Sequence, residues 1–394
     1  MKTKYIEISE FGNVITGKTP STKVPEYWNG NIPFITPTDI IGYNMRNIYE
    51  TERCVSEEGV KKITLLPINT ICISCIASIG KICVTTTSSI TNQQINSIIV
   101  NSNQYYYKYI YYLFRYNLPY LQLIASGTGS GTPIINKEKF KKLKLLVLSD
   151  LNIQKKIAYI LSKYDDLIEN NNKRIKLLEQ MAEKMYKNIF SLKKIKNTSK
   201  LIRLEEIINI TRGLSYSSEE IECEEGIDLI NLKNIKSFGG FRLDGTKKYN
   251  GKYKEEQVVK TGDLIMGVTD MTQDRRTVGY VALIPILKNL SVISADLIKI
   301  NSQVDNVYLY CMFRYGQISK YISQFANGAN VLHLKPKSVM NIKVYLPRQE
   351  KINYFVNIVK PIIQEIDLLN EQISNLIKQR DLLLPRLMSG KLEV

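Results

Sequence analysis

The chain has 394 residues, of which 44% are hydrophobic and 23% charged, and its net charge is +17. This composition excludes a disordered protein, and no apolar run reaches the roughly 20 residues that a membrane-spanning helix needs. So large a positive charge favours a polyanionic partner, usually nucleic acid, although lysine-rich usage also reflects an AT-rich genome. The N-terminal residues lack a signal-peptide core, so we expect a cytoplasmic protein.

Residues 1–149 are predicted to form a first globular domain. Short runs rich in β-branched residues indicate strands at residues 32–35, 63–66, 71–76, 81–85 and 95–100, with a last strand over 140–148. Residues 105–116 have helical spacing, and the Ser-Gly-Thr repeat at 126–132 is typical of an open loop.

Residues 150–197 are predicted to be dominated by one long helix, because residues 150–190 contain neither Gly nor Pro. Large apolar residues recur there mostly at steps of three and four, which predicts a narrow coiled-coil seam. Such a helix would be about 60 Å long, which suits a spacer or a docking rod better than a globular core. The seam and candidate docking residues are Ile153, Ile157, Ile160, Tyr164, Leu167, Ile175, Leu178 and Met181.

Residues 198–346 repeat the order of the first domain at an offset of about 195–200 residues. Thr38-Asp39-Ile40 corresponds to Lys233-Asn234-Ile235, and Leu113-Phe114-Arg115 corresponds to Met312-Phe313-Arg314. The second copy has a longer basic loop at residues 269–277. A shared framework with different loops suits two modules that recognise different targets.

Residues 347–394 are predicted to form a second long helix, whose entry and exit sequences match those of the first. Pro361 is expected to kink this helix or to mark its start. Its seam and candidate docking residues are Ile352, Phe355, Val359, Ile366, Leu369, Ile373 and Leu376. The predicted fold class is α+β: two similar mixed α/β domains, separated by two long antiparallel coiled-coil helices and related by a pseudo-twofold repeat.

Residues 12–19 satisfy the P-loop pattern, but the sequence argues against a nucleotide site. A P-loop needs a helix directly after it to face the phosphates. Pro20 and Pro25 prevent that helix, and the second copy of the segment has no lysine. Lys18 stays a candidate contact to a nucleic-acid phosphate.

Other catalytic patterns are equally weak. His333 is the only histidine, and no second cysteine pair accompanies Cys72 and Cys75, which favours reduced core cysteines over a zinc site. Residues 296–299 resemble half of a nuclease cluster but lack an upstream partner, so we interpret them as framework. No methyltransferase motif is found, and no metal or catalytic residue is assigned.

Side chains that read base edges gather in the loops of both domains. In the first domain the candidate DNA contacts are Lys18, Thr36, Thr38, Ser78, Gln93, Gln94, Thr128 and Ser130. In the second they are Arg212, Tyr216, Lys233, Asn234, Gln273, Arg275, Arg276, Asn327 and Asn330.

Several segments taken together resemble the specificity subunit of type I restriction–modification enzymes. They are Gly17-Lys18-Thr19-Pro20-Ser21, residues 27–35, Thr38-Asp39-Ile40, residues 91–94, the Ser-Gly-Thr loop and the Gln-Lys-Lys-Ile helix entry. The resemblance covers nearly the whole chain and rests on the order and duplication of these motifs. The second domain departs from the pattern because it lacks the Tyr-Trp-x-Gly element.

The resemblance implies a non-catalytic subunit. Each globular half would be a target recognition domain that reads one half of a split double-stranded DNA site. The helices would set the spacing and dock two methyltransferase subunits, which hold S-adenosylmethionine, and motor-nuclease subunits would join for cleavage. This chain would need no cofactor of its own. The alternatives are a coiled-coil adaptor that binds only protein, and a stand-alone DNA methyltransferase or nuclease.

Overall fold

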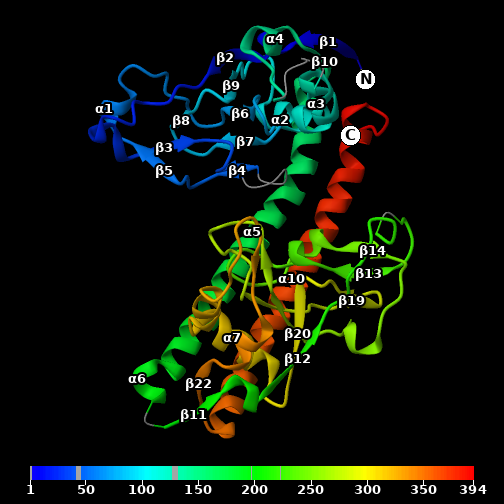
Figure 1. The fold of residues 1–394 in the computed structure, drawn as a ribbon. Helices are drawn as coiled ribbons and strands as arrows, with labels where there is room; N and C mark the ends of the chain where they lie inside the picture. The colour runs from blue at the N-terminus through cyan, green and yellow to red at the C-terminus, as the bar shows by residue number, and fades with distance from the viewer. Residues whose placement is uncertain (1, 41–45, 127–131, 197, 222) are drawn as a thin grey trace. The chain divides into compact units, whose positions relative to one another are not determined.

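The computed structural model describes residues 2–40, 46–126, 132–196, 198–221 and 223–394 (Figure 1). The chain divides into two compact units. Unit 1 comprises residues 1–172 and 371–394, and unit 2 comprises residues 173–370. Each unit thus combines a globular part with one half of each long helix. The four segments expected from the sequence stay a prediction.

The described residues of unit 1 form three sheets. Strands β1 (Thr3–Glu7) and β10 (Lys144–Leu148) form an antiparallel pair. A five-stranded sheet has the order β2-β9-β6-β7-β4, and a three-stranded sheet has the order β5-β3-β8. Their bounds are β2 Gly12–Thr16, β3 Trp28–Ile35, β4 Asn47–Ile48, β5 Arg53–Val55, β6 Ile71–Ser74, β7 Ile82–Thr85, β8 Ile90–Thr91 and β9 Ile95–Val100.

The helices of unit 1 complete its core. They are α1 Glu57–Val60, α2 Tyr107–Tyr116, α3 Leu118–Ser126 and α4 Lys137–Lys142, with short 3-10 turns at Ile8–Phe11 and Pro25–Tyr27. Every residue of β6 and β7 is buried, which explains why these strands are almost continuously apolar. Tyr109, Ile110 and Leu113 of α2 pack into the same cluster.

Unit 2 repeats most of this strand order, although its sheets differ in the number of strands. Its sheets have the orders β11-β22, β12-β20-β16-β18 and β14-β13-β19-β15, and β17 pairs with β21. The strands are β11 Lys200–Arg203, β12 Ile208–Arg212, β13 Ile227–Ile230, β14 Lys247–Tyr249, β15 Val258–Val259, β16 Leu264–Gly267, β17 Thr269–Asp270, β18 Val281–Leu283, β19 Ser291–Ile293, β20 Leu297–Ser302, β21 Leu332–His333 and β22 Lys343–Leu346. The short helices are α6 Leu192–Ile195, α7 Asn306–Tyr315, α8 Ile318–Ser323 and α9 Pro336–Met340, and 3-10 turns lie at Leu204–Glu206, Leu232–Asn234, Leu243–Gly245 and Glu255–Gln257. The predicted duplication is therefore a duplication of fold.

Two strand predictions in unit 1 were wrong. Residues 63–66 form no strand, and only Leu66 makes an isolated bridge, to Ser89. The expected strand over 140–148 begins only at Lys144, because α4 precedes it. The side chain of Asn136 accepts a hydrogen bond from the Lys139 backbone, an N-cap that favours a helical turn over a strand.

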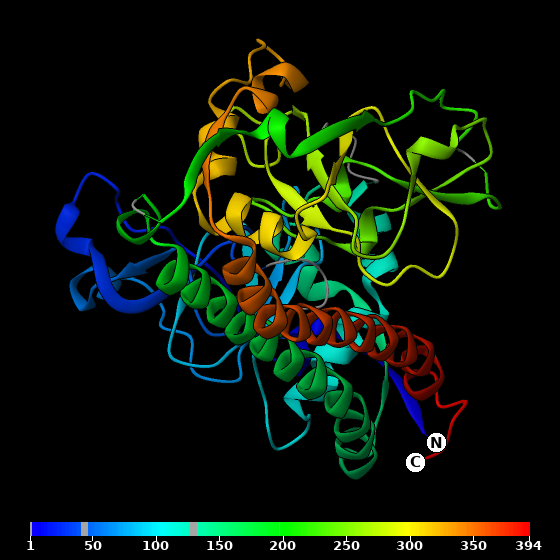
Figure 2. The same ribbon diagram turned by 90° about the horizontal axis from the view of Figure 1, so that it is seen from below.

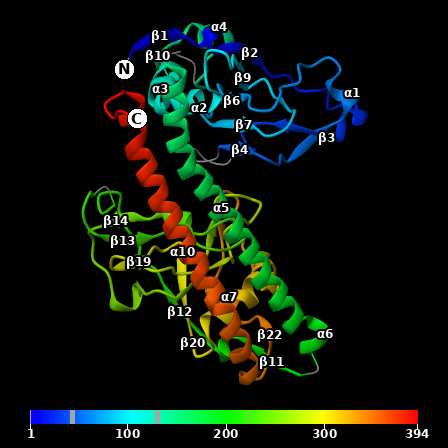
Figure 3. The same cartoon turned by 180° about the vertical axis from the view of Figure 1, so that it is seen from behind.

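The two long helices are α5 (Leu151–Phe190) and α10 (Gln349–Met388), each of 40 residues. They lie side by side within each unit (Figures 2 and 3). In unit 1, Asp165 pairs with Arg380 and Asn171 with Gln372. In unit 2, Arg174 pairs with Glu365, and Phe190 packs on Phe355. Residue numbers rise on one helix as they fall on the other, so the pairing is antiparallel and within one chain. α10 begins at Gln349, so Pro361 does not mark its start.

The structure corrects the predicted seam of α5. Its buried stripe runs through Ile157, Leu161, Asp165 and Ile168, one residue away from the predicted Ile160, Tyr164 and Leu167. Leu167 and Met181 are about half exposed, at 50% and 49%. The apolar pattern was misleading because one buried position is occupied by an aspartate, which periodicity arguments assign to the surface.

The structure also changes what the seam residues can do. Several of them are buried within the chain and are not exposed to a partner: Ile157, Ile175, Ile352, Phe355, Val359, Ile366 and Leu369. Ile153, Ile160, Tyr164, Leu178, Ile373 and Leu376 are only partly exposed. The seam therefore holds the helices together and against their units.

Candidate nucleic-acid interface

Hydrogen bonds join the predicted DNA-contact loops of unit 1 at one edge. The Thr19 hydroxyl donates to Gln93 Oε1 at 2.7 Å, which links the loop after β2 to the loop after β8. The backbone N–H of Asn92 donates to the Ile35 carbonyl at 3.1 Å, which adds the end of β3. The Cys75 N–H donates to the Gln94 carbonyl at 2.8 Å, which adds the end of β6. Four segments that are far apart in sequence thus meet.

The loop after β3 is held in a fixed shape. Asp39 Oδ2 accepts from the backbone N–H and the hydroxyl of Thr36, at 2.8 and 2.6 Å. Lys81 Nζ donates to the Pro37 carbonyl at 2.7 Å. These contacts leave Thr38 exposed beside a half-buried Thr36.

A duplicated glycine brings the same edge together in both units. A Cβ on Gly17 would lie 2.3 Å from the carbonyl oxygens of Thr91 and Asn92, and one on Gly213 would lie 2.0 Å from the carbonyl oxygen of Ser294. Only glycine allows the backbone to approach this closely. Thr16-Gly17 in the first copy and Thr211-Arg212-Gly213 in the second therefore carry a glycine for the same structural reason.

The remaining candidates of unit 1 lie on the same edge or outside the described residues. Lys18, Ser78 and Gln93 are exposed, and Gln94 is partly exposed. Thr128 and Ser130 lie outside the described residues. All of these residues stay predictions as DNA contacts.

Three loops meet in the same way in unit 2. Gln273 Nε2 donates to the Ala329 carbonyl at 2.9 Å, and the Phe238 N–H donates to the Arg276 carbonyl at 2.7 Å. The loop of residues 271–276 therefore lies between residues 236–240 and residues 327–331. Arg276 is exposed and pairs with Asp274 at 2.6 Å.

Tyr216 lies near the same edge, because the segment just before it is bonded to residues 295–296, which contact the start of the 269–277 loop. The Ala295 N–H donates to the Leu214 carbonyl at 2.6 Å, and the Thr269 hydroxyl donates to Asp296 Oδ1 at 2.8 Å. Burial and then the charge of Asp296 raise the pKa of Tyr216, so its hydroxyl is a neutral donor at physiological pH. Arg212, Lys233, Asn327 and Asn330 are exposed, and Arg275 is partly exposed.

The prediction that Asn234 contacts DNA is corrected by its burial. Its side chain is fully buried. Nδ2 donates to the Arg242 carbonyl and the Thr246 hydroxyl at 2.9 and 2.8 Å, and Oδ1 accepts from the Asn231 N–H at 2.9 Å. Asn234 thus folds its own turn and presents no atom to a ligand.

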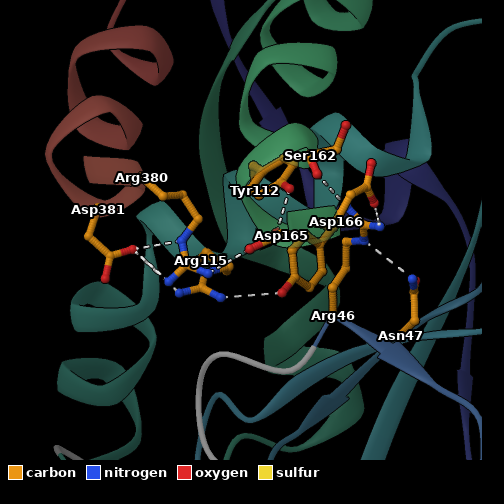
Figure 4. Close-up of polar contacts among 10 residues, drawn as sticks. Arg46, Asn47, Tyr112, Arg115, Ser162, Asp165, Asp166, Arg380 and Asp381 are labelled. Carbon is orange, nitrogen blue, oxygen red and sulfur yellow. Dashed lines mark hydrogen bonds and ion pairs between the residues drawn. The ribbon is translucent and has the colours of Figure 1, made fainter. Parts of the chain in front are cut away.

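A buried ionic network joins the helices in unit 1 (Figure 4). Arg380 of α10 is fully buried, and its Nη1 lies 2.6 Å from Asp165 Oδ1 on α5. The Tyr112 hydroxyl of α2 donates to the other oxygen of Asp165 at 2.5 Å. Burial, followed by the charge of Asp165, raises the pKa of Tyr112 well above its usual value, so the hydroxyl stays protonated.

Further pairs surround this network. Arg46 is buried, forms an ion pair with Asp166 and donates to the Ser162 carbonyl at 3.3 Å. Arg115 Nη2 of α2 lies 3.6 Å from Asp381 Oδ1 of α10. Both helices are thus tied to the globular part of unit 1 through charges.

The helix pair in unit 2 is held by rings instead. Phe190 and Phe355 have centroids 5.2 Å apart, and Tyr308 of α7 lies 5.2 Å from Phe190. Tyr186 completes the cluster at 5.9 Å from Phe355. An ion pair between Arg314 of α7 and Glu179 of α5 at 3.2 Å accompanies them, in addition to the exposed Arg174–Glu365 pair between the helices.

The weak catalytic patterns fold as framework. Residues 12–16 form β2 and Lys18 lies in a loop, so the P-loop pattern lacks its helix. Cys72 and Cys75 are free and buried, as predicted. His333 is exposed in β21, and Lys299 Nζ donates to the Val258 carbonyl at 2.7 Å. No group of three or more metal-ligating side chains occurs among the described residues.

Across the described part of the chain, no helix has both the length and the apolar character required to cross a bilayer.

Sequence reasoning missed several residues of the two interfaces. The buried partners Arg46, Asp165 and Arg380 are ordinary charged residues in the sequence. Only Arg380 gave a signal, because it occupies a seam position of the second long helix between Leu376 and Leu383. Asp270, Met271 and Phe238 also carry no motif. The position of Phe238 depends on its bond to the Arg276 carbonyl, and those of Asp270 and Met271 depend on how the loop of residues 271–276 closes.

Comparison with known proteins gives a consistent result. Residues 2–180 match the family described as Type I restriction modification DNA specificity domain. The type I restriction enzyme MjaIX specificity subunit of Methanocaldococcus jannaschii is 29% identical over 420 residues, covering 98% of this chain and 93% of that protein. The HindI specificity subunit of Haemophilus influenzae is 34% identical over 160 residues, covering 40% of this chain and 33% of that protein.

The fold has a solved counterpart. The crystal structure of a type I restriction–modification system S subunit from M. genitalium aligns with a TM-score of 0.61 at 17% identity. The alignment covers 98% of this chain and 96% of that one. At this identity the likeness is one of fold.

Proposed function

We propose that this chain, which belongs with the type I restriction enzyme specificity subunits, is the DNA-recognition subunit of a type I restriction–modification complex. Each unit reads one half of a split double-stranded DNA target. The chain selects the sequence, and partner subunits carry out the methylation and cleavage.

The duplicated loop edge is the observation that carries this proposal. In each unit the same topology gathers exposed polar and basic side chains at one edge, from segments far apart in sequence. Lysine and arginine contacts to phosphates supply affinity that falls with salt, and side chains in the grooves supply sequence choice. The proposed DNA contacts are those predicted from the sequence, without Asn234.

The long helices serve as the docking site for methyltransferase subunits. The surface for this role is the exposed face of the helices, because the predicted seam is largely buried. Its large apolar residues are Tyr159, Leu167 and Leu382 in unit 1, and Leu177, Met181, Tyr354 and Leu368 in unit 2. Given 100° per residue, Tyr159, Leu177, Met181, Leu368 and Leu382 lie roughly opposite the buried stripe, and Leu167 and Tyr354 lie at its flank. Exposed apolar groups of this kind are typical of a protein interface.

Two methyltransferase subunits are expected per chain, because this chain supplies both reading units. S-adenosylmethionine is expected in those subunits and no cofactor in this chain. Motor-nuclease subunits complete the complex for cleavage.

The proposal is tested by co-expression with a cognate methyltransferase subunit. We expect a complex of one specificity and two methyltransferase subunits, and methylation mapping is expected to reveal adenine methylation at one split motif. A chain that assembles with the methyltransferase but gives no motif would support the adaptor instead. Methylation by the isolated chain would support a stand-alone methyltransferase.

Docking has its own matched variants. Leu177→Glu places a charge among the exposed apolar residues of α5, and we expect loss of assembly. Asn172→Glu adds the same charge at an exposed polar position of α5 and is expected to assemble normally. Equal assembly of both variants would show that this face of α5 does not contact the methyltransferase subunit.

A further inference from the structure

The loop of residues 271–276 differs from its counterpart in unit 1 in how it is built. In unit 1 the Ser74 hydroxyl closes a short turn, accepting from the Lys81 N–H at 2.9 Å and donating to the Ser78 carbonyl. In unit 2 a longer loop leaves β17 and returns at Val278. The two ends of this longer loop meet at the carboxylate of Asp270, whose side chain is only 2% exposed.

Asp270 accepts hydrogen bonds from both ends of the loop. Oδ1 accepts from the N–H and the hydroxyl of Thr272, each at 2.7 Å. Oδ2 accepts from the N–H and the hydroxyl of Thr277 at 2.6 and 2.9 Å, and from the Val278 N–H at 3.3 Å. One side chain thus joins the two ends of the loop.

The charge of Asp270 is stabilised despite its burial. Burial by itself opposes ionisation, but the bonds from the Thr277 and Thr272 backbone and hydroxyl groups outweigh it and lower the pKa of Asp270. The carboxylate is therefore charged at neutral pH, and the loop keeps its shape across the physiological range.

The loop is held in a strained conformation. Arg275 has φ = 53° and Phe238, which bonds to the loop at Arg276, has φ = 65°. This left-handed region costs a non-glycine residue about 1 kcal/mol or more and persists only where the surroundings enforce it. Strain of this kind is concentrated at binding sites.

The loop presents an exposed apolar side chain and, at its far end, two arginines. Met271 is 79% exposed, more than any other large hydrophobic side chain that the structure describes. Phe238 is 54% exposed, with its ring 5.5 Å from that of Tyr280. Arg275, Arg276 and Asp274 follow Met271, so the exposed tip has a net positive charge. An exposed apolar side chain on a loop that also carries two arginines fits DNA, where thymine methyl groups and base steps are the apolar features.

We propose that residues 271–276 form a preformed reading loop, in which Met271 makes the apolar contact to the bases of one half-site and Asp270 is the positioning residue. This inference rests on the proposed function and adds to it the residues that set sequence choice in unit 2. A loop already in its bound shape loses less entropy on binding, so its contacts discriminate more sharply.

The experiment uses the assembled complex of the full chain with its methyltransferase subunits. The variants are Asp270→Asn, which removes the charge and one acceptor oxygen, and Met271→Ala, which touches no internal hydrogen bond in the structure. The matched control is Asp263→Asn. Asp263 accepts the Lys260 N–H at 2.9 Å in a turn at the opposite end of β16.

We expect methylation mapping to give a degenerate half-site for Asp270→Asn and Met271→Ala, with the other half-site unchanged. For Met271→Ala, the preference for the correct base over the other bases is expected to fall about tenfold at one or two positions of that half-site. The Asp263→Asn complex is expected to keep the wild-type motif. This one-sided change is a readout that a general loss of stability would not produce.

Two results would overturn the inference. One is an unchanged motif for Met271→Ala, which would show that the loop tip does not contact the bases. The other is an equal loss at both half-sites by a folded Asp270→Asn complex. If Asp270→Asn fails to fold, Met271→Ala alone decides. A wild-type complex that methylates no split motif would instead count against the proposed function.

Discussion

The two units hold the same helix pair by different chemistry. In unit 1, charges meet in the interior: Arg380 and Asp165 are both nearly inaccessible, and Tyr112 supplies the remaining bond. In unit 2, aromatic rings pack between the helices, with Phe190 and Phe355 in edge contact. A charged pair in a buried site permits few alternative pairings, because a shifted helix would leave both charges unpaired. Rings tolerate small shifts.

The difference indicates a division of roles between the two junctions. As a hypothesis, the polar junction fixes the register of α10 against α5, and the aromatic junction supplies apolar burial. The following predictions test that contrast, from the largest expected effect to the smallest.

Arg380→Ala is expected to destabilise unit 1 by about 3–5 kcal/mol, because it leaves the Asp165 carboxylate buried without its cation. The sole tryptophan, Trp28, lies in unit 1, packed against Phe34 and Arg53. Its fluorescence during urea unfolding therefore reports this unit. A loss below about 1 kcal/mol would contradict the prediction.

The double variant Arg380→Met with Asp165→Leu separates stability from register. Replacing both partners by apolar residues is often neutral or stabilising by about 1–4 kcal/mol. We expect urea stability near wild type. If the charges fix register, distances measured between spin labels on α5 and α10 within unit 1 are expected to broaden. An unbroadened distribution would remove the register role.

Asp367→Asn tests a partly buried charge on α10 in unit 2. Burial raises the pKa of Asp367 to about 6, against a smaller opposing effect of Lys236. A carboxyl whose folded pKa is raised favours the folded state at low pH, so its contribution is lost as pH rises from about 4 to about 6. We expect the variant to be more stable than wild type at pH 8 by on the order of 1–2 kcal/mol, and equal near pH 4. Hydrogen exchange of unit 2 peptides at both pH values measures this, and an equal difference at both would refute it.

Phe355→Leu is expected to cost about 1 kcal/mol, because it keeps most of the volume but loses the ring contacts with Phe190, Tyr186 and Tyr308. Hydrogen exchange of unit 2 peptides measures the change, and Trp28 fluorescence is expected to stay constant. A loss of several kcal/mol in the stability of unit 2 would show that the aromatic junction tolerates substitution no better than the polar one.

Arg174→Ala is expected to change stability by less than about 0.5 kcal/mol. Its ion pair with Glu365, at 2.7 Å, joins two side chains that are 50% and 40% exposed, and exposed pairs contribute little. The same exchange measurement applies. A larger loss would show that surface pairing also holds the helices.

Much of the architecture could be predicted from local patterns. The two long helices follow from the apolar spacing of residues 150–190 and from residues 349 onward, and the repeat follows from matched segments such as Leu113-Phe114-Arg115 and Met312-Phe313-Arg314. These signals are local, because helical periodicity and short motifs are complete within a few turns of chain. The P-loop pattern could be rejected for the same reason, since Pro20 is adjacent to it.

The candidate interfaces depended on contacts between distant segments. Arg380 and Asp165 are 215 residues apart, and the buried stripe of α5 passes through Asp165, one residue after the predicted Tyr164. Asn234 looked like a loop residue available to DNA, but its neighbours satisfy its amide inside the fold. Asp270 carries no motif, and its five hydrogen bonds exist only once the loop has closed. Sequence thus determined the helices and the duplication, which local spacing encodes, whereas tertiary structure decided which polar side chains are buried, because burial depends on what the rest of the chain packs against them.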